Sequence, residues 1–176
     1  MLDRLYKRRS IRKYKSKKLD NSTVQTLLRA ALLSPSSRGF QPWQFIVVDD
    51  PQILAQLALA KKGAGFLKGS ALGVVILVDP GLSDVWIEDA SIAATILHLT
   101  TDSLGLGSCW IQIRERQHTE TETAEQYVRR ILGIPENIKV ASIISIGYPD
   151  EFKPPYTEQD LKISEKVHLN NYGSKY

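Results

Sequence analysis

Apolar residues recur along the chain with two different periods, and these separate helices from strands. After Ser22 the apolar side chains lie three and four positions apart, as on one face of a helix. Ser22 and Gln25 have the Ser-x-x-Gln spacing of a capping box, which predicts Ser22 as the N-cap of this helix. Ser34-Pro35 ends it, because the residue before a proline disfavours helical geometry. The buried face consists of Val24, Leu27, Leu28, Ala31 and Leu32.

Four other segments are predicted to be helical: residues 2–9, 51–60, 83–104 and 121–132. The third of these is the longest, and at 1.5 Å per residue it would span about 33 Å. Its side that carries Ala90, Ala93, Ala94, Leu97 and Leu104 is built largely of small residues, which let another backbone approach closely. This helix is therefore predicted to form the core or the seam of a dimer.

Short runs rich in β-branched and aromatic residues predict four strands, at residues 43–48, 71–78, 109–113 and 140–146. Strands and helices mix without a strict β-α-β order. We therefore predict an α+β fold, in which helices enclose a mostly antiparallel sheet, and a single domain over residues 1–176.

The last part of the chain, residues 148–176, has no hydrophobic periodicity. Pro149, Pro154 and Pro155 punctuate this polar segment, which is predicted to be an extended arm that cannot pack on itself. Such an arm usually wraps another surface. The arm therefore favours a homo-oligomer.

Several classes of protein are disfavoured by simple counts. The apolar runs are strand-sized and far shorter than the roughly 20 residues of a membrane span. A charge within the first three residues and the lack of an apolar segment there argue against a secretory signal. Cys109 is the one cysteine, so a cytoplasmic protein is expected. Cys109 and the three histidines are too scattered to indicate a zinc site, and no metal is expected.

Charge is distributed unevenly. The whole chain has a formal net charge of +4, but nine basic residues and no acidic one lie between residues 4 and 18, which leaves −5 on the remainder. Such a segment indicates an anionic partner, either nucleic acid, a membrane surface or a phosphorylated small molecule; the alternative is a solvated basic face. The nine residues are Arg4, Lys7, Arg8, Arg9, Arg12, Lys13, Lys15, Lys17 and Lys18.

Three segments have residue patterns that suit a ligand. In an extended loop, Arg8, Ser10 and Arg12 would point to one side, and two guanidinium groups with a hydroxyl suit a phosphate on a polyol tail. Residues 34–43 form a Ser-rich turn between prolines, which is either a source of rigid donors or a capped turn before a core tryptophan. In residues 104–112, two glycines allow a sharp turn and bring the backbone close to a ligand.

Taken together, these segments resemble the nitroreductase family in order and spacing. The matching stretches are Arg-Arg-Ser-Ile-Arg-Lys-Tyr from residue 8, Pro-Ser-Ser-Arg-Gly-Phe-Gln-Pro-Trp from residue 35, Leu-Gly-Leu-Gly-Ser-Cys-Trp-Ile from residue 104 and Ile-Gly-Tyr-Pro from residue 146. The resemblance covers nearly the whole chain. It implies a nitroreductase-like fold and a homodimer that binds FMN at the subunit interface, with the arm wrapping the partner.

The resemblance also implies roles for individual residues. The basic segment would hold the phosphate, ribityl chain and pyrimidine edge of FMN, and the Ser-rich turn would reach the same flavin from the partner subunit. The backbone amide of Gln112 would face the N5 atom of the ring. In the family, a basic residue near the C-terminus helps to bind the phosphate. This chain has no clean match to it, and Lys153 is assigned to that role. The implied FMN-binding residues are Arg8, Arg9, Ser10, Arg12, Pro35, Ser36, Ser37, Gln41, Ile111, Gln112 and Lys153.

Three functions remain open from the sequence. The leading one is an FMN enzyme that passes reducing equivalents from NAD(P)H to a nitroaromatic, a quinone or a similar electrophile, with no catalytic side chain because the flavin carries the chemistry. The second keeps the flavin but changes the reaction to dehydrogenation, dehalogenation or flavin breakdown. The third is a non-catalytic module that stores flavin or binds nucleic acid. It ranks last, and neither nucleic acid nor a membrane is the expected partner.

Overall fold

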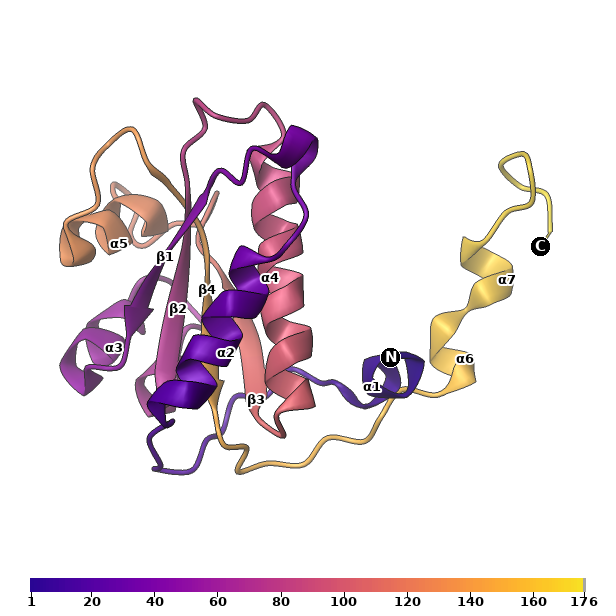
Figure 1. The fold of residues 1–176 in the computed structure, drawn as a ribbon, viewed down its shortest axis with the longest axis horizontal. Helices are drawn as coiled ribbons and strands as arrows, with labels where there is room; N and C mark the ends of the chain where they lie inside the picture. Colours follow the sequence, from indigo (N-terminus) through magenta and orange to yellow (C-terminus); the bar gives the residue numbers. More distant parts are fainter. Residues whose placement is uncertain (176) are drawn as a thin grey trace.

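The structure, a computed structural model, describes residues 1–175; Tyr176, the last residue of the predicted arm, lies outside the described residues. Its centre is a four-stranded sheet in the order β1-β2-β4-β3, and each pair of neighbours is antiparallel (Figure 1). The prediction of an α+β fold with a mostly antiparallel sheet is therefore confirmed. The strands are β1 (Trp43–Val48), β2 (Leu72–Val78), β3 (Gly107–Gln112) and β4 (Lys139–Gly147).

Helices cover both faces of the sheet. α2 (Asn21–Leu32) and α4 (Trp86–Ser103) lie on one face, and α3 (Pro51–Leu57) and α5 (Ala124–Leu132) lie on the other (Figure 1). Successive residues of a strand point to opposite faces, so Val74 and Ile76 pack toward α2 and α4 whereas Val75 packs toward α3 and α5. All of β2 and nearly all of β4 is buried, which explains why both appear as unbroken apolar runs in the sequence.

The long helix α4 forms part of the core, which is one of the two alternatives predicted from the sequence. Ala90, Ala93, Ala94 and Leu97 are buried against α2 and the sheet. Leu104, predicted on the same face, is instead 42% exposed. The reason is that α4 ends one residue before it, and the chain then turns away at Gly105, whose φ is +71°.

Some predicted element ends were wrong. α2 is capped by Asp20, whose carboxylate accepts from the Thr23 amide at 2.8 Å, and the Ser22 hydroxyl donates to that same carboxylate. An ionised oxygen is the stronger acceptor, so Ser22 acts as a donor and not as the cap. Likewise α4 begins at Trp86 and not at Ser83, because the Ser83 hydroxyl bonds to a side chain of α4. The predicted helix at 121–132 begins at Ala124 behind a Thr123 capping box.

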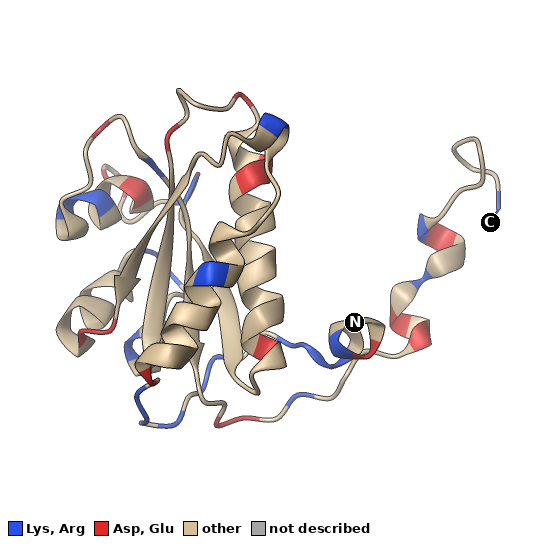
Figure 2. Ribbon diagram, viewed as in Figure 1, with Lys and Arg blue, Asp and Glu red and all other residues tan. Residues whose placement is uncertain are grey.

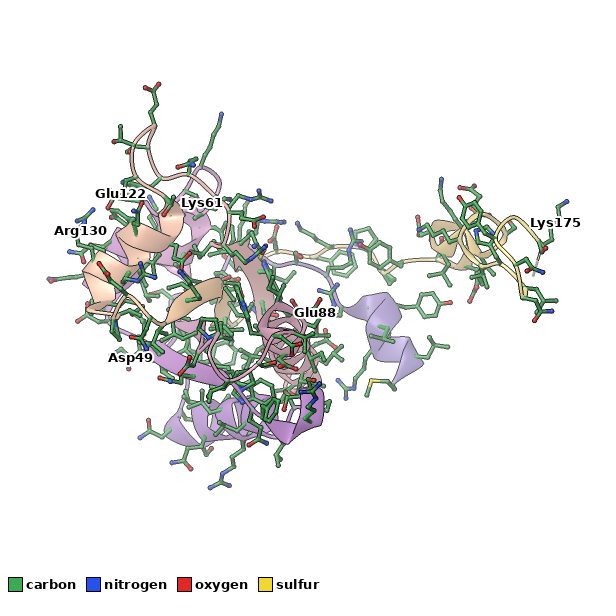
Figure 3. All side chains as sticks on the ribbon, turned by 90° about the horizontal axis from the view of Figure 1, so that it is seen from above. Asp49, Lys61, Glu88, Glu122, Arg130 and Lys175 are labelled. Carbon is green, nitrogen blue, oxygen red and sulfur yellow. The ribbon has the colours of Figure 1, made fainter. Side chains whose placement is uncertain are left out.

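Both ends of the chain lie away from the sheet. The short helix α1 (Leu2–Lys7) and the C-terminal segment run beside each other, joined by a backbone hydrogen bond from Tyr156 to Tyr6 of 2.9 Å. Residues 154–175 are all exposed and extend away from the body, with Lys175 at the far end (Figure 3). The sequence predicted an extended arm, and this prediction was wrong for part of the segment. The segment contains two short helices, α6 (Glu158–Leu161) and α7 (Ile163–Lys166).

Two short 3-10 helices, η1 (Ser37–Gly39) and η2 (Gly65–Gly69), complete the described elements. Over residues 1–175, no helix has the length and apolar character that crossing a bilayer requires. In the same part of the chain, no group of three or more His, Cys, Asp or Glu side chains is arranged to hold a metal ion.

Candidate functional site

The basic segment follows the free edge of the sheet. After α1 it pairs with β3, where the Ile11 amide donates to the Ser108 carbonyl at 3.0 Å and Ser10 forms a parallel bridge with Ser108. It then passes the end of β4, where the Lys15 amide donates to the Tyr148 carbonyl at 2.9 Å. Figure 2 shows the resulting line of basic residues along the loop that leaves α1 and passes beneath the sheet.

Two glycines allow this close approach. Gly107 of β3 and Gly147 of β4 are cross-strand partners. A Cβ at residue 107 would lie 2.8 Å from the Cβ of Ile11, and one at residue 147 would lie 2.9 Å from the ring of Tyr14. Gly107 was expected to bring the backbone near a ligand; its lack of a side chain makes room for Ile11. The two glycines therefore fix where the basic segment lies.

Polar contacts hold the same segment. The Tyr14 hydroxyl lies 2.7 Å from the Ser145 Oγ, and burial raises the pKa of Tyr14, so it stays a neutral hydroxyl. Glu151, just after β4, accepts hydrogen bonds from the backbone amides of Arg12 and Lys13. These donors hold the pKa of Glu151 below its usual value, with the Arg12 amide contributing most. Partners outside the loop thus anchor its backbone, and these contacts do not use the cationic side chains.

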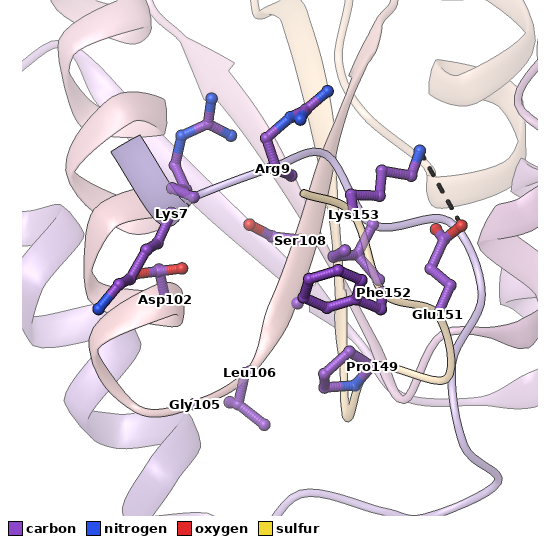
Figure 4. A pocket seen from close by; sticks show the side chains of 13 residues that line it. Lys7, Arg9, Asp102, Gly105, Leu106, Ser108, Pro149, Glu151, Phe152 and Lys153 are labelled. Atoms are coloured by element: carbon purple, nitrogen blue, oxygen red, sulfur yellow. Dashed lines mark ion pairs between the residues drawn. The ribbon is translucent and has the colours of Figure 1, made fainter. Parts of the chain in front are cut away.

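A pocket of about 230 Å³ opens beside this loop, and cations dominate its charged lining (Figure 4). Arg9 in this lining is already engaged, since its guanidinium donates to the Pro154 carbonyl and lies 4.4 Å from the centre of the Tyr156 ring. Lys153 is 3.9 Å from a Glu151 carboxylate oxygen. The charged lining residues are Lys7, Arg8, Arg9, Lys153, Asp102 and Glu151.

Arg8 is the exception among these cations. It is half-buried, yet within residues 1–175 its guanidinium has neither a hydrogen-bond acceptor nor an ion-pair partner. Its guanidinium is therefore available to an external anion, which would form charge-assisted hydrogen bonds with it. Arg8 also lines a neighbouring pocket of about 270 Å³ with Ser10, His98 and Trp110. This arrangement can bind an anion together with a polar tail.

Arg12 is placed differently from Arg8. Its side chain is exposed, and the guanidinium lies 5.6 Å from the centre of the Phe66 ring. Arg12 lines neither of the two pockets that Arg8 lines. The structure therefore brings together Arg8, Arg9 and Lys153, and Ser10 beside Arg8, but it leaves Arg12 at the rim of the region.

His98 lies in the wall of the second pocket, on α4. It is 8% exposed, and its Nδ1 is 2.7 Å from the Ser108 Oγ, which confirms the expectation of a packed, hydrogen-bonded histidine. Burial, reinforced by the positive charge of Arg8, lowers the pKa of His98 to about 4. The ring is therefore neutral above that pH and adds no charge beside Arg8.

The low pKa of His98 predicts a loss of stability in acid. The unfolded chain takes up a proton at this residue near pH 6.5, whereas the folded chain does so only near pH 4. The contribution of His98 is therefore constant well above pH 6.5 and falls between pH 6.5 and 4, by roughly 2.5 kcal/mol at pH 4.5. Urea unfolding at pH 7 and 4.5 checks this. The His98→Gln variant, which cannot titrate, should lose less stability than the parent; an equal loss would contradict the assignment.

The Ser-rich turn lies at the start of α4, whereas Arg8 shares its pockets with α4 residues between Thr95 and Asp102. The Ser37 amide donates to Asp89 at the start of α4, whereas Arg4, beside Arg8, pairs with Asp102 at its end. Thirteen residues of helix separate the two aspartates, which is about 20 Å. Neither pocket lined by Arg8 contains a residue of 35–41. Pro35, Ser36, Ser37 and Gln41 are thus held together at one site, remote from Arg8 of the same copy.

In the second half of β3, the side chains are engaged within the protein, whereas the backbone of alternate residues faces outward from the sheet edge. Ile111 is 2% exposed and packs in the core, and the Gln112 side chain is engaged with Trp110 and Arg114. The Ile113 amide bonds to Ala141 of β4, and hydrogen-bonded pairs alternate along an antiparallel ladder. Residues 108, 110 and 112 therefore direct their backbone groups outward from the sheet edge. The amide of Gln112 is an outward donor.

Sequence reasoning missed three residues of this region. Lys7 lines the pocket with Arg8, and its place in the basic run was a usable signal. Glu151 anchors the loop backbone and Asp89 anchors the Ser-rich turn, and nothing in the local sequence indicated either contact. The Cys109 thiol is buried, which raises its pKa, so the expectation of an inert thiol fits its surroundings.

The fold and this arrangement of motifs define a class of protein: the chain belongs to the nitroreductase family. The model of that family matches residues 5–80 and 62–148. The chain is 36% identical, over 97% of its length and 98% of the relative's, to a protein of Archaeoglobus fulgidus whose name gives it NADH dehydrogenase or NAD(P)H nitroreductase activity.

Solved structures agree with this assignment. An FMN-dependent nitroreductase from Clostridium difficile R20291 superimposes with a TM-score of 0.96 at 48% identity, covering 98% of this chain and 100% of that one. A protein of Parabacteroides distasonis, also named for NADH dehydrogenase and NAD(P)H nitroreductase, superimposes with a TM-score of 0.88 at 30% identity. The two matches cover 98% and 97% of this chain. The nitroreductase-like fold expected from the sequence is confirmed.

Proposed function

We propose that this protein is an FMN-dependent oxidoreductase that passes reducing equivalents from NAD(P)H to a nitroaromatic, a quinone or a similar small electrophile. The observation that carries the proposal is Arg8, a half-buried guanidinium with no hydrogen-bond or ion-pair partner among residues 1–175, in a pocket that Lys153 also lines. The names of similar proteins support the same cofactor, because one solved relative at 48% identity is an FMN-dependent nitroreductase.

The residues present fit FMN. The phosphate would bind between Arg8 and Lys153, since guanidinium and ammonium groups are the donors that phosphate prefers. Ser10, which lines the second pocket beside Arg8, would donate to the ribityl chain. Arg9 lines the same pocket as Arg8 and Lys153, and Arg12, farther along the segment, is assigned to the pyrimidine edge. The flat ring would lie along the edge of β3, where the amide of Gln112 points outward, and Ile111 would support that strand from the core.

Bound FMN would supply hydride transfer, taking a hydride from the nicotinamide and giving it to the acceptor. The protein's contribution is electrostatic and positional. Cationic side chains beside the pyrimidine edge would stabilise the negative charge that accumulates there on reduction, and a fixed amide of Gln112 would orient the ring. His98, neutral above pH 4, would leave this charge pattern unchanged over the physiological range.

We also propose a homodimer in which the Ser-rich turn of one copy reaches the flavin held by the other. Neither pocket that Arg8 lines contains Pro35, Ser36, Ser37 or Gln41 of the same copy, which supports this proposal. The exposed C-terminal segment, residues 154–175, supports it as well, since its Leu161, Ile163, Val167 and Leu169 are all at least 37% exposed. Its apolar side chains would be covered by a partner.

Purified protein should be yellow and should release FMN when it is heated. Mixed anaerobically with excess NADH or NADPH, it should lose the flavin colour, and adding a nitroaromatic or a quinone should restore it. Protein that binds FMN but is bleached by neither nicotinamide would contradict the reductase and favour another flavin reaction. Colourless protein that cannot be reconstituted with FMN, and that shifts an oligonucleotide, would contradict both.

A further inference from the structure

Asp89 is a buried carboxylate that the proposed chemistry does not use. It lies in the first turn of α4 and is 1% exposed. Its Oδ1 accepts from the Ser37 amide at 2.8 Å, and its Oδ2 accepts from the Ser83 hydroxyl at 2.7 Å. In the described part of the chain it has no cationic partner. Both of its oxygens are thus directed at the loops that flank the start of α4.

A charge in this position does little for packing. Burying a carboxylate without a cation is unfavourable, and the start of a helix offsets only part of that cost. The neighbouring Glu88 places a similar charge in the same helical turn, but it is exposed and forms no hydrogen bond to the Ser-rich turn among the described residues. What distinguishes Asp89 is therefore its hold on the Ser37 amide, 52 residues earlier in the chain.

The turn that Asp89 holds has an unfavourable backbone. Arg38, Gly39 and Gln41 have φ values of +52°, +70° and +48°, and two of these three residues are not glycine. Such conformations persist only where the surroundings hold them in place. The Ser36 Oγ closes the turn by accepting from the Gln41 amide at 2.9 Å, but the link from the turn to α4 is the bond from Ser37 to Asp89.

We propose that Asp89 is a positioning residue for the flavin site of a second copy of this chain. Through the Ser37 amide it holds Ser36 and Ser37 in the place from which they would contact FMN bound by the partner. The inference rests on the proposed function. It goes further in one respect: Asp89, which shares no pocket with Arg8 of its own copy, would control FMN affinity in the other subunit and not in its own.

FMN titration of three purified variants gives the first test. Asp89→Ala should raise the Kd for FMN roughly 10- to 100-fold, as expected for a lost hydrogen bond to a charged group. Asp89→Asn keeps an acceptor for the Ser37 amide and should recover most of the affinity. Glu88→Ala, the matched control, removes the same charge from the same turn and should match the parent. A parent-like Kd for Asp89→Ala would overturn the proposal.

A heterodimer separates positioning across the interface from a merely structural role. One subunit carries Arg8→Ala and the other carries Asp89→Ala, with different affinity tags, and the mixed dimer is purified through both. One of its two sites then combines an intact Arg8 with an intact turn from the opposite copy. At a free FMN concentration above the Kd of the parent and below the Kd of the Asp89→Ala homodimer, the expected stoichiometry is one FMN per heterodimer, against little or none in either mutant homodimer. One FMN would also show that the Asp89→Ala subunit is folded.

Zero FMN in the heterodimer would overturn the proposal, because Asp89 would then act within its own subunit. Two FMN would overturn it as well, because neither change would matter. Failure of the proposed function has a different signature, since the parent protein itself would bind no FMN. The two hypotheses can therefore fail separately.

Discussion

Replacing Arg8 with alanine is expected to weaken FMN binding by at least about 100-fold, while the chain still folds. The guanidinium would make charge-assisted, bidentate bonds to the phosphate, each of which contributes roughly 1.5–3 kcal/mol. Within the described residues Arg8 has no internal partner, so its removal leaves no buried acceptor unsatisfied. Isothermal titration with FMN measures the first effect, and circular dichroism with thermal unfolding measures the second.

The variants of Arg12 and Lys13 provide the comparison. Arg12→Ala alone is expected to have a smaller effect than Arg8→Ala, because its side chain is exposed and lies over Phe66 outside the pocket. Lys13→Ala, an exposed cation of the same loop, should be close to the parent. The double variant Arg8→Ala/Arg12→Ala should retain its fold and no measurable FMN. If it still held stoichiometric FMN, the basic segment would not be the phosphate site.

Gly107→Ala is expected to reduce both stability and FMN affinity, although no ligand-binding side chain changes. The new Cβ would lie 2.8 Å from the Cβ of Ile11, a contact with no free side-chain rotation to relieve it. Overpacking of this kind costs about 1–3 kcal/mol, and each kcal/mol lowers the Tm by about 2–4 °C in a chain of this size. The segment that carries Arg8 and Ser10 would be pushed off the sheet edge, so the Kd for FMN should rise.

Gly65→Ala is the matched control for Gly107→Ala. A Cβ at residue 65 has no atom within 4 Å, and the residue does not require positive φ, so both Tm and Kd should stay near the parent values. The exchange variant Ile11→Gly/Gly107→Ala removes the clash and should recover part of the lost affinity. A lower Tm for Gly107→Ala with an unchanged Kd would mean that the position of the loop does not govern binding.

The sheet could be predicted from sequence because its central strands are buried on both faces. β2 and β4 are therefore unbroken apolar runs, and their predicted ends differ from the observed ones by one residue at most. Helix ends were harder to predict, because they depend on which of several nearby polar side chains forms the hydrogen bond to the free backbone amides. The cap of α2 is Asp20 and not Ser22. Ser83 lies in the loop before α4, where its hydroxyl donates to Asp89, and not in the helix itself.

The site was predictable where its residues are contiguous and unpredictable where they meet through the fold. The run of residues 8–12 carries its own signal in charge and spacing. Lys153 could be assigned only through resemblance, yet it lies in the pocket with Arg8. Local sequence could not show that Glu151 holds the Arg12 amide or that Asp89 holds the Ser37 amide, because those partners are 139 and 52 residues apart.

The basic segment is proposed to hold the phosphate of FMN between two copies of the chain. A crystal structure of the protein with FMN tests it most directly, through the distance from the phosphate oxygens to the guanidinium of Arg8. We expect hydrogen bonds of about 2.7–3.2 Å there, with residues 35–37 of the second copy against the same flavin. A phosphate bound elsewhere, with Arg8 facing open solvent, would contradict it.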